Sequence, residues 1–149
     1  MIIAKFLHIL SVVIWVGGMF FAYMALRPVA AERLEPPQRL SLWEGVFGKF
    51  FPWVWTSIAV ILITGVYLMI NMGMPPAHYI SLMLVLGMLM MLLFAHVFFA
   101  PYKRLKRAVA AKDWTAGGAA LGQIRKLIAI NLSLGLVTVT VATLGKYLG

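Results

Sequence analysis

Four long apolar runs, separated by shorter polar stretches, set the pattern of this chain. The hydrocarbon core of a bilayer is about 30 Å thick, and a helix of about 20 apolar residues crosses it. Each run reaches that length without an internal cluster of charges. The pattern therefore predicts four transmembrane helices, at about residues 2–26, 51–71, 79–100 and 124–147.

The two longer connections, residues 28–50 and 101–123, are expected at the membrane surface. In the first, residues 38–50 alternate apolar and polar groups at helical spacing, which predicts a short helix along the interface. In the second, the small residues of TAGGAALG at 115–122 predict a flexible joint. We therefore expect residues 1–149 to form one transmembrane domain, an all-α four-helix bundle.

Composition agrees with a membrane protein, because 63% of the residues are hydrophobic and only 11% are charged. A soluble domain carries about 25% charged residues. The chain has no cysteine, which excludes disulfides, thiolate metal sites and a cysteine nucleophile.

The basic residues predict the orientation of the bundle. Of the thirteen lysines and arginines, all but Lys5 and Lys146 lie in or beside the two longer connections. The positive-inside rule places these connections in the cytoplasm, and both termini and the 72–78 turn on the outer, periplasmic side of a bacterial inner (plasma) membrane. The net charge of +9 thus indicates topology, and no nucleic-acid partner is expected.

The acidic residues exclude one class of chemistry. All four carboxylates lie in the predicted cytoplasmic connections, so no acid–base pair for hydrolysis is expected near the outer side. We assign no catalytic residue. If the protein is an enzyme, a haem-dependent oxidoreductase is the class that the sequence leaves open.

Polar side chains at membrane depth fall into two levels, using a rise of about 1.5 Å per residue. Such groups are costly in lipid and usually face the interior of a bundle. The outer level holds His8, about 9 Å below the surface, with Thr64, Thr140 and Thr143. The inner level holds Ser57, His96 and Asn131.

The histidines at these levels are candidate haem ligands. The depths of His8 and His96 differ by about 10–15 Å, so one haem is not expected to join them. A b-type haem on His8 alone, or on His8 with Met83 or Met88, fits known ligation. The alternative is that His8 and His96 only bond a hydroxyl or a carbonyl, and that the methionines fill gaps in packing.

The outer turn INMGMPPAH, residues 70–78, is a candidate copper site. Met72, Met74 and His78 offer two thioethers and one imidazole, donors that suit the soft ion Cu(I). The alternative is a plain turn, in which the prolines end the second helix and His78 starts the third.

The first helix, FLHILSVVIWVGGMFFAYMALRP, resembles that of the copper resistance protein D (CopD-like) family. The match is carried by His8, Trp15, Gly17, Gly18, Arg27 and Pro28. This resemblance implies a four-helix membrane protein that handles copper.

The same segment is similar to the HemJ-type protoporphyrinogen oxidases, and LLFAH, ending at His96, is similar to their third helix. That resemblance implies b-type haem on His8. The lysine that these oxidases carry earlier in the third helix is missing from residues 81–87 of this chain, where Val85 or a neighbour takes its place.

The leading interpretation is an inner-membrane copper-handling protein that collects Cu(I) at the turn and holds or passes it at His8. The alternatives are a haem-binding, HemJ-like oxidoreductase and a small assembly subunit without a cofactor. The lipid bilayer is the expected partner. The sequence leaves open a homodimer, a periplasmic copper donor and a quinone.

Overall fold

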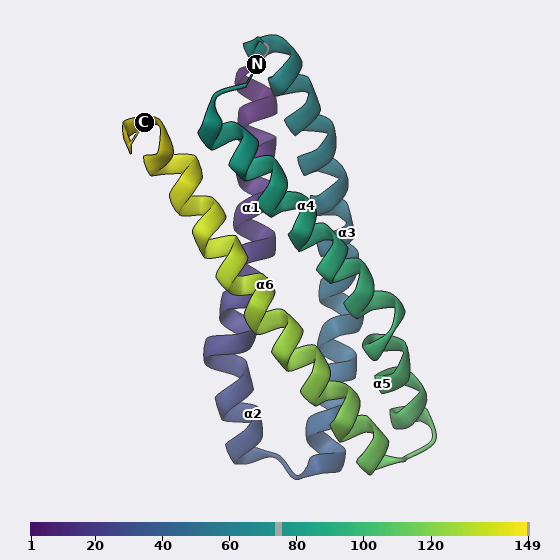
Figure 1. Cartoon of the computed structure of the whole chain (residues 1–149). Helices are drawn as coiled ribbons and strands as arrows, with labels where there is room; N and C mark the ends of the chain where they lie inside the picture. The colour runs from purple at the N-terminus through teal and green to yellow at the C-terminus, as the bar shows by residue number, and fades with distance from the viewer. Residues whose placement is uncertain (74–75, 149) are drawn as a thin grey trace.

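The computed structural model describes residues 1–73 and 76–148, and within these ranges every long segment is helical (Figure 1). The order is α1 (Ile2–Phe21), the π-helical turn η1 (Ala22–Leu26), α2 (Arg27–Arg33), α3 (Pro36–Met72), α4 (His78–Phe99), α5 (Pro101–Ala110) and α6 (Trp114–Leu148). Four helical stretches are long and apolar enough to cross a membrane. The predicted all-α membrane bundle is therefore confirmed.

The first helical rod runs without a break from Ile2 to Arg33. Within it, the backbone N–H of Arg27 bonds the carbonyl of Ala22, five residues back. This i to i−5 bond accommodates one more residue in the turn than an α-helix does, which rotates the following side chains around the rod.

Helix α3 is one helix of 37 residues, so the separate interfacial helix predicted at 38–50 is wrong. The side chains of Trp43, Phe47 and Phe51, four residues apart, stack along one buried face at centroid distances of 5.2 and 4.9 Å. This stripe continues at Val54 and Ile58, which are also buried. Because the same face is packed on both sides of Pro52, the helix continues through the proline.

The flexible joint predicted at 115–122 is also wrong, because these residues form the first turns of α6. The carboxylate of Asp113 accepts a hydrogen bond from the backbone N–H of Ala116 at 3.1 Å, which caps the helix. Gly117 is buried, and a Cβ there would lie 3.0 Å from Leu40 and 3.5 Å from Ala108. The small residues therefore serve close packing of helices rather than flexibility.

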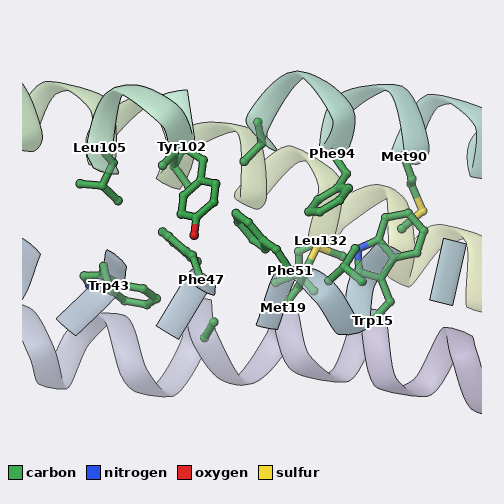
Figure 2. Packing of buried hydrophobic residues seen from close by; sticks show 14 of the residues in the cluster. Trp15, Met19, Trp43, Phe47, Phe51, Met90, Phe94, Tyr102, Leu105 and Leu132 are labelled. Atoms are coloured by element: carbon green, nitrogen blue, oxygen red, sulfur yellow. The ribbon is translucent and has the colours of Figure 1, made fainter. Parts of the chain in front are cut away.

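The helices pack chiefly in pairs, α1 along α3, and α4 and α5 along α6. Aromatic side chains join the pairs: Phe94 of α4 contacts Trp15 of α1 and Phe51 of α3 at centroid distances of 6.4 and 5.1 Å (Figure 2). Tyr102 of α5 adds an edge contact to Phe51 at 4.8 Å. The core of the bundle is therefore aromatic.

The bundle has two ends that differ in charge. The N-terminus, the end of α3, the start of α4 and the C-terminus lie toward one end, which we call the turn end (Figure 1). The opposite end, which we call the basic end, is formed by α2, α5 and the starts of α3 and α6. Most lysines and arginines belong to the basic end.

Candidate metal site

His8 lies on α1, against α3, at the turn end of the bundle. Its Nδ1 is 2.9 Å from the hydroxyl of Thr64, which is itself buried. The two residues were predicted at the same depth, and this hydrogen bond confirms it. His8 is half-buried, so a lone polar ring in an apolar segment has found a partner in the interior.

The hydroxyl of Thr64 favours the tautomer of His8 that carries its proton on Nδ1. Thr64 donates its only hydroxyl proton to a backbone carbonyl, that of Val60, at 2.6 Å. With that proton engaged, its oxygen can accept a hydrogen bond from His8 Nδ1–H, because a hydroxyl has one donor and two lone pairs. In a neutral imidazole the other nitrogen, Nε2, is left with a lone pair and can bind a metal ion.

The backbone of α3 is open beside this ring. A Cβ at Gly65 would lie 3.5 Å from His8 Cε1, an ordinary contact distance. The His8 ring therefore lies beside the backbone of α3 at Gly65, next to Thr64. On the same face of α1, one turn further in, Ser11 is buried.

At the turn itself, His78 is the first residue of α4, as in the plain-turn alternative, and it is exposed. Met72 ends α3 and is also exposed, with 49% of its surface accessible. Gly73 follows with a φ of 94°, a conformation that favours glycine. Met74 lies outside the described residues. The described thioether and imidazole are therefore at the surface, at opposite ends of one short connection.

The candidate haem ligands lie elsewhere. Met83 is half-buried and Met88 is exposed, both on α4, which packs along α6 rather than α1. His96 is exposed in the last turn of α4, at the end away from His78. His8 and His96 thus belong to different ends of the bundle, in agreement with their predicted depths.

The remaining polar groups serve the helices. Thr140 and Thr143 are exposed and donate to the carbonyls of Leu136 and Val139 on their own helix. The buried amide of Asn131 donates to the carbonyl of Met90 at 3.3 Å, which joins α6 to α4. Of the residues that the sequence analysis placed at the outer level, His8 and Thr64 are therefore the two that bond each other.

Within residues 1–73 and 76–148, no group of three or more histidine, cysteine, aspartate or glutamate side chains could hold a metal ion. A metal site among these residues would therefore contain at most two such side chains, with other donors beside them. The hydrogen bond between His8 and Thr64 was not visible in the sequence, because it depends on how α1 and α3 are rotated against each other.

Comparison with known proteins gave one family. The family model described as copper resistance protein D matches residues 44–144, which is more than half of the chain. The matched region contains His78 and His96, while His8 precedes it. No match was found among the curated proteins or among the solved structures.

Proposed function

The chain belongs to the copper resistance protein D family, and from this membership we propose that it binds Cu(I) at the turn between α3 and α4. We further propose that His8 is the next position of the ion, inside the membrane. Copper is the cargo in this proposal. The protein is an integral membrane protein, in agreement with its four apolar helices.

The donor set of the turn supports this proposal. Thioethers from Met72 and Met74 and the imidazole of His78 are soft or intermediate donors, which prefer Cu(I) to Mg²⁺ or Ca²⁺. The four carboxylates that hard cations need all belong to the basic end. Met72 and His78 are exposed, so an ion or a copper-donating protein can reach them from outside.

The observation that carries the inner position is the hydrogen bond from His8 to Thr64. Metal-binding histidines usually donate their second ring N–H to a fixed acceptor, which holds the tautomer and orients the ring. Thr64 is the fixed acceptor here, and the lone pair of His8 Nε2 remains to bind the ion. His8 lies about 9 Å along α1 from its first residue, which places it just below the turn end.

The test is a competition titration of Cu(I) against a colorimetric chelator, on protein purified in detergent. Replacing Met72 and Met74 by leucine keeps volume and hydrophobicity, so folding survives, and we expect affinity at the turn to fall at least tenfold. The matched controls are Met88→Leu and His96→Ala, which remove an exposed thioether and an exposed imidazole outside the site. These controls should bind Cu(I) like the wild type.

The same preparation tests haem as the alternative, since an imidazole with a free Nε2 is also a haem ligand. Bound haem gives a Soret band, whereas a Cu(I) protein is colourless. If the double leucine variant retains full Cu(I) affinity, the turn is not a copper site. A Soret band that His8→Ala abolishes would then assign His8 to haem.

A further inference from the structure

A cavity of about 240 Å³ lies at the basic end, far from His8. It is lined by residues of η1, α2 and the N-terminal parts of α3 and α6. Three of the lining residues are arginines, Arg27, Arg39 and Arg125, and none is acidic. The rest of its wall is aromatic or apolar, including Trp43 and Trp114.

Arg39 lines this cavity and is held in place by backbone carbonyls. Its terminal nitrogen donates to the carbonyls of Ala31 and Leu34, at 3.3 and 3.0 Å, across the α2–α3 connection. Its Nε is buried and has no acceptor among the described residues. A ligand in the cavity does not reach this Nε, but the two bonds restrain the guanidinium, and a guanidinium pairs best with an anionic oxygen.

Arg27 is already held in place for a ligand. Its Nε donates to the carbonyl of Tyr23 at 3.1 Å, and its guanidinium lies 4.4 Å from the centre of the Tyr23 ring. These contacts leave its terminal nitrogens as donors on a restrained side chain.

The irregular turn η1 belongs to the same cavity, because Ala22 and Tyr23 line it together with Arg27. A π-turn inside an α-helix is rare and is frequent at functional sites. Here the extra residue of the turn lies where α1 meets α2. Ala22, Tyr23 and Arg27, which line the cavity, all come from this junction.

We propose that this cavity binds the phosphate headgroup of an anionic phospholipid. Arginine forks pair with phosphate oxygens through two parallel hydrogen bonds, and three of them compensate the charge. The volume of about 240 Å³ is larger than a bare phosphate needs, so room remains for the rest of a headgroup. The apolar wall, including Leu121 and Ile128, covers the glycerol and the first acyl carbons.

The position of the cavity also favours a lipid over a dissolved anion. The basic end carries most of the lysines and arginines of the chain, including the exposed Lys103 and Arg107 of α5. Such clusters beside membrane-spanning helices attract anionic headgroups. A headgroup held between α2 and α6 would join two helices that otherwise meet mainly through η1 and α3.

The experiment measures binding of phosphatidylglycerol, phosphatidylcholine and inorganic phosphate to the full chain in detergent by native mass spectrometry. Arg125→Gln removes one charge from an exposed residue of the cavity, and we expect binding of phosphatidylglycerol to weaken about fivefold. Gly118→Leu keeps all charges but fills space, because a Cβ there meets nothing within 4 Å. This variant should weaken binding by at least the same factor.

The matched controls are Arg33→Gln and Gly45→Leu, an exposed arginine and an open helical glycine at the same end but outside the cavity. They should bind phosphatidylglycerol like the wild type. Equal binding by all four variants would overturn the proposal. So would equal binding of phosphatidylcholine, or binding of inorganic phosphate as tight as that of the lipid.

Discussion

The two ends of the bundle differ in how tightly their side chains pack and in which groups they expose. At the basic end, Trp43, Phe47 and Phe51 are buried in a continuous aromatic stack that contacts Tyr102. At the turn end, large apolar side chains such as Ile70 are exposed, where lipid covers them in a membrane. Packing energy is therefore concentrated at the basic end. The turn end is left with polar and sulfur-containing groups that an incoming ion can reach.

The comparison depends first on which side of the membrane each end faces. A fusion experiment tests this, and its expected result is all-or-none. A reporter that is active only outside the cytoplasm should be active when fused after Gly149. The same reporter fused after Lys112, in the connection between α5 and α6, should be inactive. Activity in the reverse order would place the proposed copper ligands in the cytoplasm and contradict the comparison.

The next largest effect is on stability. Phe51→Ala empties space between Phe47, Phe94 and Tyr102, and we expect the free energy of unfolding to fall by about 3–5 kcal/mol. At the turn end, Ile70→Ala should cost less than about 0.5 kcal/mol, because its side chain is 71% exposed.

The measurement is reversible unfolding of both variants by a denaturing detergent, followed by circular dichroism. Similar losses in the two variants would show that stability is spread evenly along the bundle. Because Phe51 and Ile70 lie on the same helix, the two values report the two ends under identical conditions.

The sequence predicted the number, type and approximate position of the helices, because long apolar runs leave few alternatives. The predicted ends of the helices were wrong where one sequence pattern is compatible with two structures. The glycines at 115–122 are read equally well as a joint or as a packing surface, and only contact with Leu40 and Ala108 decides for packing. The apolar face of the stretch at 38–50 could pack against the lipid surface or against a neighbouring helix. In the structure it packs against α5.

The candidate sites show the same difference between what the sequence predicts and what helix packing decides. Depth along a helix follows from a constant rise, so His8 and Thr64 were placed at one level from the sequence. Their hydrogen bond, and the cavity around Arg27 and Arg39, depend on the rotation and pairing of helices, which periodicity does not give. The family was suggested by the first helix, whereas the family model matches residues 44–144. Copper binding by Met72, Met74 and His78 stays a prediction.

An effect smaller than the loss of stability at Phe51 concerns the hydroxyl of Thr64. Thr64→Val keeps the shape of the side chain but removes the acceptor for His8 Nδ1–H, so the ring can adopt either tautomer. Since only the Nδ1–H form offers Nε2 to a metal, we expect the affinity of His8 for Cu(I) to fall about tenfold. The titration is done in a background where Met72 and Met74 are leucine and His78 is alanine, so that His8 is measured alone.

The matched control for this substitution is Thr143→Val, whose hydroxyl is exposed and bonds only a carbonyl of its own helix. It should leave affinity unchanged. Nitrogen NMR of labelled histidine gives a second readout without copper: in the metal-free protein the His8 signal should report a protonated Nδ1 and an unprotonated Nε2. A protonated Nε2 in the wild type would remove the physical basis for His8 as the inner copper ligand, even if the turn itself binds the ion.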